Sequence, residues 1–306
     1  MITIFACPKA FTDPHIATIQ MNAIRSWTML RPTPDVIVFG DEDGIAEACV
    51  ELGVRHVPRV ERNEFGTPLL NDVFAKVDKL AKFPLRCYAN ADIILTADFT
   101  KAVQRAAGSG QPFLMSGGRS GLDVTAPLDF RCEDWEERVI AAAKAQAQFS
   151  FWGNDYFVFT PGIYGVVPPL AIGRAMFDAW FFEAAKAVGA KIIDASKAIT
   201  AVHQNHDYRH TPTGDVNGVF IGPEADHNTA FVGSGRQWFL MDATHELTDK
   251  GLHRVWGRKL RVRAREILIY KTGTVRKAVG LNRAGLRKLA DICGLAAEQA
   301  GSRRDV

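Results

Sequence analysis

Long hydrophobic segments and paired cysteines are both missing from this 306-residue sequence. No apolar run approaches the roughly 20 residues that a membrane-spanning helix needs. The first five residues look like a strand and lack the basic start of a signal peptide. The five cysteines are widely scattered and form no Cys-x-x-Cys pair, which argues against cysteine-based zinc or redox chemistry. We therefore expect a cytoplasmic protein whose cysteines are mostly buried thiols.

The common phosphate-binding loops are also missing. Neither a Walker loop nor a Gly-x-Gly-x-x-Gly motif follows the first expected strand, which argues against NTPases and dehydrogenases. The sequence has no internal repeat and no low-complexity segment. Its composition, with 47% hydrophobic and 23% charged residues, is that of an ordinary globular protein. The length fits one large domain with an appendage.

Basic residues are concentrated near the C-terminal end. The segment from Lys250 to Val306 has 15 basic and 4 acidic residues, a net charge of +11, whereas the rest of the chain carries −8. We therefore divide the chain into a domain of residues 1–249 and a basic helical extension of residues 250–306. The extension could contact the inner face of an anionic membrane, pack on the acidic domain, or remain exposed to solvent. Nucleic acid is not a favoured partner.

Short apolar runs alternate with amphipathic stretches over the first hundred residues, as in βαβ units. Strands are expected at residues 2–7, 35–40, 54–57, 86–95, 112–116, 156–160, 191–194 and 198–202. Helices are expected at residues 13–30, 45–52, 70–82, 132–148 and 172–188. The pattern predicts an α/β fold with a mixed, mostly parallel sheet flanked by helices.

Two polar residues interrupt the apolar strand at residues 86–95. Asn90 and Asp92 are two positions apart, so their side chains would point to the same side of an extended chain. A buried carboxylate needs a partner. A divalent cation is one such partner, because it takes oxygen ligands and neutralises charge on a leaving diphosphate. The alternative is an aspartate that caps a neighbouring turn.

A histidine-rich segment follows the last of these strands. His203, His206 and His210 are spaced by three and four residues, and Asp207 could orient one of the rings. Imidazole binds metals near neutral pH. The alternative is a polar loop whose histidines only form hydrogen bonds, but the concentration of polar groups favours a site.

Asp155 directly precedes the apolar strand at residues 156–160. At the mouth of a cleft, a carboxylate in this position could remove the proton of an acceptor hydroxyl. The alternative is an aspartate that caps a turn.

Smaller candidates lie elsewhere. Asp41 and Asp43 are in the acidic loop after the second strand, where ligands bind in open α/β sheets. Arg174 could clamp a phosphate or pair with a carboxylate. The remaining candidates are Asn71 and Lys76, which could face a nucleotide, and Asp178 and Asp194. For Lys76, an exposed helix face is the alternative.

Five segments of the chain resemble, in this order, a family of glycosyltransferase-like proteins in the nucleotide-diphospho-sugar transferase superfamily. They are residues 39–44, 88–93, 153–159, 171–174 and 202–208. The resemblance covers roughly residues 1–247, and its most specific element is the His-Gln-Asn-His-Asp-Tyr string. It implies a GT-A fold in which residues 1–100 bind the nucleotide and residues 101–249 form the acceptor side.

The resemblance also implies residue roles. The Asp-x-Asp-type motif that binds manganese or magnesium matches Asn90 and Asp92, and the late histidine of the metal site matches His203 or His206. The base of inverting members matches Asp155. One departure is that Asn90 replaces the first acid, which removes a negative charge from the metal site and lowers the expected metal affinity.

The leading functional hypothesis is sugar transfer from a nucleoside-diphosphate donor to a hydroxyl acceptor, which could be a glycan, a lipid-linked molecule or a small molecule. Transfer would be metal-assisted, with inversion if Asp155 is the base. Such an enzyme would serve the synthesis of bacterial polysaccharides or glycoconjugates. One alternative is a metal-dependent hydrolase that uses His203, His206 and His210, and that binds zinc tightly without a nucleotide. The other is a non-catalytic scaffold that binds nucleotide sugars without turnover.

Overall fold

The computed structural model describes residues 1–207, 213–232 and 239–255. The helices are α1 (Pro14–Met29), α2 (Ile45–Leu52), α3 (Leu70–Leu80), α4 (Ala97–Ala107), α5 (Trp135–Gln146), α6 (Phe177–Ala187) and α7 (Pro223–Val232), with 3₁₀ turns η1 (Val216–Phe220) and η2 (Leu240–Asp242). The strands are β1 (Ile2–Ala6), β2 (Asp35–Phe39), β3 (Arg55–Val57), β4 (Leu85–Ala89), β5 (Ile93–Ile94), β6 (Phe113–Ser116), β7 (Arg119–Leu122), β8 (Gln148–Ser150), β9 (Tyr156–Phe159), β10 (Lys191–Asp194), β11 (Ala201–Gln204), β12 (His245–Thr248) and β13 (Gly251–Arg254).

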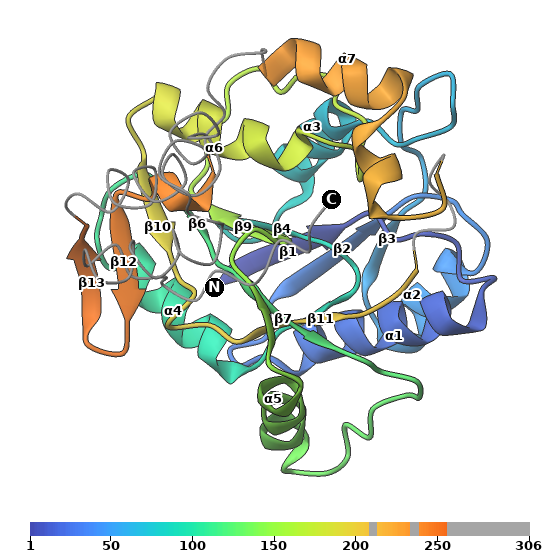
Figure 1. Cartoon of the computed structure of the whole chain (residues 1–306), viewed down its shortest axis with the longest axis horizontal. Coiled ribbons are helices and arrows are strands. Elements are labelled where there is room, and N and C mark those ends of the chain that lie inside the picture. The colour runs from blue at the N-terminus through green and yellow to red at the C-terminus, as the bar shows by residue number, and fades with distance from the viewer. Residues whose placement is uncertain (208–212, 233–238, 256–306) are drawn as a thin grey trace, which may run out of the picture.

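The main sheet of the described residues has nine strands in the order β13-β12-β10-β6-β9-β4-β1-β2-β3 (Figure 1). Strands β3, β2, β1 and β4 are parallel, while β9 runs antiparallel to both β4 and β6. A smaller sheet has the order β5-β11-β7-β8. The predicted α/β class, with a mostly parallel sheet flanked by helices, is confirmed.

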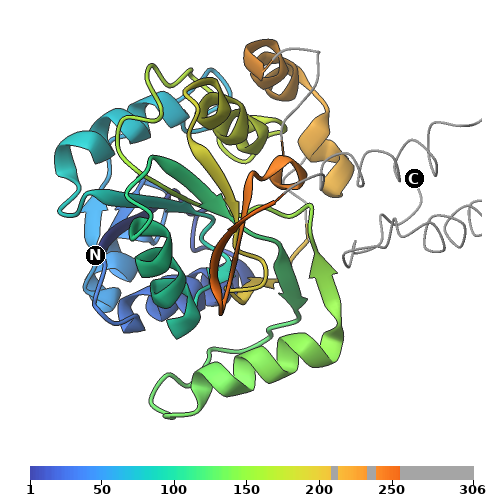
Figure 2. The ribbon, with the colours of Figure 1, turned by 90° about the vertical axis from the view of Figure 1, so that its left-hand side faces the viewer.

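Helices cover both faces of the main sheet (Figure 1). Successive side chains of β1 pack against different helices. Ile4 packs in the apolar cluster that includes residues of α1, α2 and α4. Phe5 packs in the cluster that includes residues of α3 and α6. Successive side chains of a strand point to opposite faces, so both faces of β1 are buried. Helix α5 packs on the smaller sheet and projects from the body (Figure 2).

The expected strand at residues 86–95 is in fact two strands joined by a turn. β4 ends at Ala89, and β5 starts at Ile93 in the other sheet. Two backbone hydrogen bonds produce this bend. The backbone N–H of Asn90 donates to the backbone carbonyl oxygen of Asp155, and the backbone N–H of Ile93 donates to the backbone carbonyl oxygen of Asn90. Asn90 and Asp92 therefore lie in a turn, and the prediction that they share one face of an extended strand is wrong.

Two other elements, α6 and β11, have bounds that change where a predicted site residue lies. Helix α6 begins only at Phe177, because Gly173 (φ 75°) and Met176 (φ 72°) adopt left-handed backbone conformations that interrupt a helix. Arg174 is thus in a turn. β11 covers Ala201–Gln204 instead of residues 198–202, which places His203 within a strand.

The predicted helical extension starts differently from expectation. Residues Gly251–Arg254 form β13, which pairs with β12 through Leu252 opposite Leu247. The boundary drawn at 249/250 therefore falls inside a β-hairpin. Residues 256–306, on which the helical and membrane-contact predictions mainly rest, lie outside the described part of the chain. Among the described residues, no helix is long and apolar enough to span a membrane.

Candidate functional site

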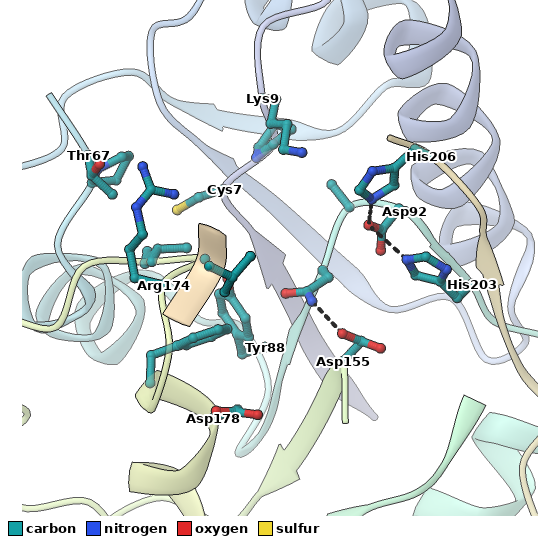
Figure 3. Close-up of a pocket in the computed structure, with 18 of the residues that line it drawn as sticks. Cys7, Lys9, Thr67, Tyr88, Asp92, Asp155, Arg174, Asp178, His203 and His206 are labelled. Atoms are coloured by element: carbon teal, nitrogen blue, oxygen red, sulfur yellow. Dashed lines mark hydrogen bonds and ion pairs between the residues drawn. The ribbon is translucent and has the colours of Figure 1, made fainter. Parts of the chain in front are cut away.

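A cavity of about 530 Å³ opens beyond the carboxyl ends of β1 and β4 (Figure 3). This is where ligands bind in open α/β sheets. The polar and charged side chains that line it include Lys9, Glu42, Asn90, Asp92, Arg119, Asp155, Arg174, Asp178, His203 and His206.

Strand pairing brings Asp92 to the histidines. In the antiparallel pair of β5 and β11, Ile93 lies opposite His203, and the amide of Gln204 donates to the Asp92 carbonyl oxygen at 3.2 Å. The Asp92 Oδ2 atom lies 3.1 Å from His206 Nε2 and 3.6 Å from His203 Nε2 (Figure 3). The sequence predicted that Asp92 meets one of these histidines, and the structure places both beside it.

The outer nitrogen of each ring has an acceptor of its own. His206 Nδ1 lies 2.7 Å from the carbonyl oxygen of Asp207, which can only accept a hydrogen bond. His203 Nδ1 lies 3.4 Å from Asn205 Oδ1, and the amide nitrogen of Asn205 donates to Asp123 Oδ1 at 2.8 Å, which fixes the orientation of the amide. Nδ1 therefore carries a proton in both rings, and in the neutral form of each ring the lone pair of Nε2 faces Asp92.

This arrangement fits a divalent metal ion. Two imidazole lone pairs and a carboxylate oxygen face one another, and their atoms all lie within 4.8 Å of each other. Asp92 Oδ1 is also buried without a hydrogen-bond partner among the described residues. Facing acceptors repel unless a proton or a cation lies between them. Carboxylate with imidazole is a ligand set that suits first-row transition metals.

Charges around the cluster keep these groups in the protonation states that bind metal. Burial lowers the pKa of His203, and the charge of Arg119 lowers it further, so the ring is neutral. Burial by itself would raise the pKa of Asp92, but in the acid range where Asp92 titrates, the charge of protonated His203 and the hydrogen bond and charge of protonated His206 outweigh burial. The pKa of Asp92 is therefore far below its ordinary value, and this carboxyl is ionised.

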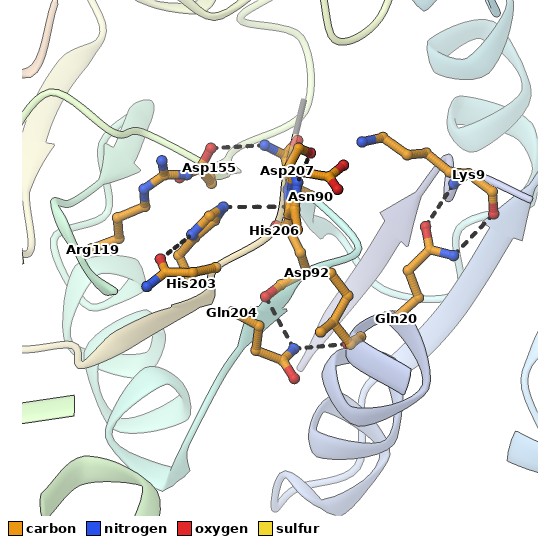
Figure 4. Close-up of polar contacts among 12 residues, drawn as sticks. Lys9, Gln20, Asn90, Asp92, Arg119, Asp155, His203, Gln204, His206 and Asp207 are labelled. Atoms are coloured by element: carbon orange, nitrogen blue, oxygen red, sulfur yellow. Dashed lines mark hydrogen bonds and ion pairs between the residues drawn. The ribbon is translucent and has the colours of Figure 1, made fainter. Parts of the chain in front are cut away.

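Asp155 has both carboxylate oxygens engaged. Asn90 Nδ2 donates to Oδ1 at 2.8 Å, and Arg119 Nη1 donates to Oδ2 at 2.5 Å (Figure 4). A side chain at Gly153 would come within 2.5 Å of Arg119 Nε, so glycine leaves the room that the guanidinium occupies. The side-chain amide nitrogen of Asn90 thus donates to Asp155.

Two cationic side chains also line the cavity. Burial lowers the pKa of Lys9, whereas the charges of Asp92 and Asp207 raise it. Arg174 Nε donates to Glu224 Oε2 of α7 at 2.8 Å, which holds the guanidinium at the rim. Figure 3 shows Arg174 and Asp92 on opposite sides of the view, with Lys9 between and above them. A cavity with these two cations and a bound metal ion would attract an anion such as a diphosphate.

Asp178 is a second carboxyl on the cavity wall, in the first turn of α6. Its Oδ1 accepts a hydrogen bond from the Ala179 amide at 2.9 Å. Burial, with a smaller contribution from the charge of Asp155, raises its pKa to about 6. The neighbouring Phe177 packs edge-on against Tyr88, with ring centroids 6.1 Å apart.

Several residues predicted to bind the nucleotide do not line the cavity, namely Asp41, Asp43, Asn71 and Lys76. Asp41 Oδ1 pairs with Arg62 Nη2 at 2.6 Å. Lys76 Nζ donates to Asp72 Oδ2 at 2.5 Å and to a backbone carbonyl oxygen at 2.6 Å. Its charge is thus balanced by a carboxylate of the same helix, α3. The smaller candidate Asp194 accepts hydrogen bonds from Ser196. His210 lies outside the described residues.

The cavity also includes residues that the sequence did not single out, chiefly Lys9, Glu42 and Arg119. Glu42 lies between the two predicted aspartates, and the missed signal is Gly40 (φ 118°), where a side chain would lie 2.3 Å from Glu42 Oε2. Lys9 follows closely after the first strand. Nothing in the local sequence marks Arg119.

No protein-family model and no curated protein matches the sequence. Among solved structures, the chain is similar to TarS 1–349 of S. aureus in complex with UDP-GlcNAc, with 12% identity and a TM-score of 0.44 over 69% of this chain and 60% of that one. It is also similar to the mannosyltransferase PcManGT of Pyrobaculum calidifontis in complex with GDP-Man and Mn²⁺, with 15% identity and a TM-score of 0.40 over 66% of this chain and 56% of that one. The chain thus matches less than two thirds of each neighbour's length. At these scores the likeness carries no weight for substrate or mechanism, which depend on the side chains of the cavity.

Proposed function

We propose that the protein transfers a sugar from a nucleoside-diphosphate donor to a hydroxyl acceptor, with a divalent metal held by Asp92, His203 and His206. The observation that carries this proposal is the cluster itself: three ligands converge in one cavity that also contains Lys9 and Arg174. When bound, the metal would neutralise charge on the leaving diphosphate. The resemblance of five sequence segments to glycosyltransferase-like proteins supports the same class of reaction.

The ligand set favours manganese over magnesium. Magnesium prefers oxygen ligands and keeps several waters, whereas imidazole suits transition metals. Two of the three ligands here are imidazoles, His203 and His206, and only Asp92 supplies oxygen. The side-chain amide nitrogen of Asn90 is bound to Asp155, which orients this residue.

The contacts of Asp155 favour a positioning role for this residue. As the base it would have to release Arg119 or Asn90 before it could accept a proton. As a positioning group, it holds Arg119 beside the metal cluster, where the charge of Arg119 helps to keep His203 neutral.

Donor binding is the first test of the proposal. A ligand that binds only the native state raises the unfolding temperature. We expect a nucleotide sugar from a panel of UDP-, GDP-, CMP- and dTDP-linked compounds to stabilise the protein more with Mn²⁺ than without it. No stabilisation by any member, with or without Mn²⁺, would contradict the proposal.

Turnover is the second test. Asp92→Ala should abolish release of the nucleotide from the stabilising donor, because a metal ligand is lost, while the fold is retained. Asp129→Ala is the matched control, since Asp129 is an exposed carboxylate paired with Arg131 away from the cavity. Equal turnover by Asp92→Ala and the wild type would contradict the metal assignment.

The same experiments separate the two other hypotheses. A metal-dependent hydrolase would contain tightly bound zinc and would need no nucleotide. A non-catalytic scaffold would be stabilised by a nucleotide sugar and would release no nucleotide from it.

A further inference from the structure

Three carboxyl groups outside the metal cluster line the cavity: Glu42, Asp155 and Asp178. Glu42 forms an ion pair with Arg62 at 2.8 Å. Asp155 and Asp178 are held in different ways. We propose that Asp178 is the catalytic base, which takes the proton from the acceptor hydroxyl, and that Asp155 is a positioning residue. This assignment rests on the proposed sugar transfer and names the group that completes it.

Asp155 is poorly suited to accept a proton. It is buried, with an exposed fraction of 8%, and Asn90 and Arg119 each occupy one of its oxygens. An arginine ion pair stabilises the charged form of a carboxyl and opposes protonation.

Asp178 has no such restraint. Among the described residues it makes no ion pair, and one oxygen accepts a hydrogen bond from the amide of Ala179. The backbone before it is fixed, because the buried amide of Asn228 donates to the carbonyl oxygens of both Ala171 and Ala175. Met176 then adopts a left-handed conformation, φ 72°, that starts α6 at the cavity wall. Strained backbone of this kind occurs at functional sites.

The surroundings of Asp178 suit a base that works near neutral pH. Phe177 and Tyr88 form an apolar wall beside it, and the pKa of Tyr88 is raised well above 10 by burial, so the phenol is neutral. Asp155 is the charged group that acts on Asp178 most strongly, and its own charge is countered by Arg119. A general base is most effective when its pKa is near the working pH, and that of Asp178 is raised to about 6.

The proposed step balances as follows. The acceptor hydroxyl gives its proton to the Asp178 carboxylate, and its oxygen forms a bond to the anomeric carbon of the donor. The bond from that carbon to the phosphate oxygen breaks, and its electron pair leaves with the nucleoside diphosphate. Attack on the face opposite to the leaving group inverts the anomeric configuration.

The test uses the full chain, the nucleotide sugar that stabilises it, and water as the acceptor. Asp178→Asn should slow donor hydrolysis by roughly 10²- to 10⁴-fold. Donor stabilisation should be unchanged, and the acid limb of kcat near pH 6 should disappear. Glu183→Gln, on the same helix but away from the cavity lining, is the matched control and should keep the wild-type rate and profile.

A nucleophile without a proton provides a second readout. Azide ion needs no base, so added azide should restore release of the nucleotide from the donor in Asp178→Ala and form the glycosyl azide. A variant that is inactive for structural reasons would gain nothing from azide, and that result would overturn the assignment.

The outcomes distinguish this assignment from the proposed function. An Asp178→Asn variant with wild-type rate and acid limb would overturn the assignment, and loss of both in Asp155→Asn would transfer the role to Asp155. If the wild type hydrolyses no nucleotide sugar, the proposed function fails and the assignment fails with it.

Discussion

Two carboxyls on the cavity walls, Asp155 and Asp178, have the same chemistry in different environments. Asp155 lies at the start of β9 with its oxygens bound by an amide and a guanidinium. Asp178 lies at the start of α6 beside aromatic rings, with a backbone amide as its neighbour.

The difference shows how burial acts on a charge. A buried carboxylate with strong partners is a fixed negative charge, which organises the groups around it. A largely buried carboxylate without a cation resists ionisation, and its pKa rises above its ordinary value. Asp155 is therefore suited to positioning, and Asp178 is suited to proton transfer.

The largest effect should come from removing the ion pair between Arg119 and Asp155. Arg119→Met would leave the Asp155 charge buried without its cation, so the free energy of unfolding should fall by about 3–5 kcal/mol. Urea unfolding at pH 7 measures the change. Arg131→Met is the control, because the Arg131–Asp129 pair is exposed. Similar small changes in both variants would show that the Asp155 pair is no more demanding than a surface pair.

Asp178, which makes no ion pair among the described residues, should make the free energy of unfolding depend on pH. The folded-state pKa of Asp178, about 6, exceeds its ordinary value of 3.8, so the folded state binds more protons between these values and wild-type stability falls as pH rises through them. Asp178→Asn removes that loss. We therefore compare the free energy of unfolding of the variant minus that of the wild type at two pH values. This difference should be up to about 3 kcal/mol more favourable to the variant above pH 7 than at pH 3.5. Urea unfolding at the two pH values measures this gain, and a difference that does not change with pH would argue against a raised pKa.

A smaller effect should follow from loosening the metal cluster. Asn205→Ala removes the acceptor for His203 Nδ1, and such outer partners typically account for about 10- to 100-fold in metal affinity. Calorimetric titration with Mn²⁺ measures the change. Asp123→Asn, one contact further out, should weaken binding less. Equal affinity in Asn205→Ala and the wild type would mean that Asn205 does not orient the ring.

The smallest effect should come from a residue that only the sequence analysis placed at the nucleotide. Lys76→Met removes a pair with Asp72 four residues away on α3, which contributes about 0.2–0.5 kcal/mol. Donor stabilisation should not change. Lys9→Met is the matched comparison, because Lys9 lines the cavity, and it should weaken donor binding. Weaker donor binding in Lys76→Met would restore the sequence-based assignment.

Much of the fold could be predicted from the sequence because its elements are locally encoded. Helix α2 has the predicted bounds, and α1 covers Pro14–Met29 where residues 13–30 were predicted, with Asp13 as its N-terminal cap. The failures occur where tertiary contacts decide the backbone. The bend at Asn90 depends on a partner 65 residues away, and the late start of α6 depends on left-handed residues.

The site was harder to predict than the fold. The proximity of Asp92 to His203 follows from the pairing of β5 with β11, which no local pattern reveals. Arg119 comes from β7 of the smaller sheet, and its role depends on a glycine at position 153. Residues at strand ends could be listed as candidates, but only the fold shows that Glu42 faces the cavity and that Asp41 pairs with Arg62.

The central claim is that Asp92, His203 and His206 hold a metal ion, and Mn²⁺ bound to the protein tests it most directly. Electron paramagnetic resonance should show one Mn²⁺ per chain, with nitrogen couplings from two imidazoles that are reduced to one in His203→Ala and in His206→Ala. Bound Mn²⁺ without nitrogen coupling, or no bound Mn²⁺, would contradict the account.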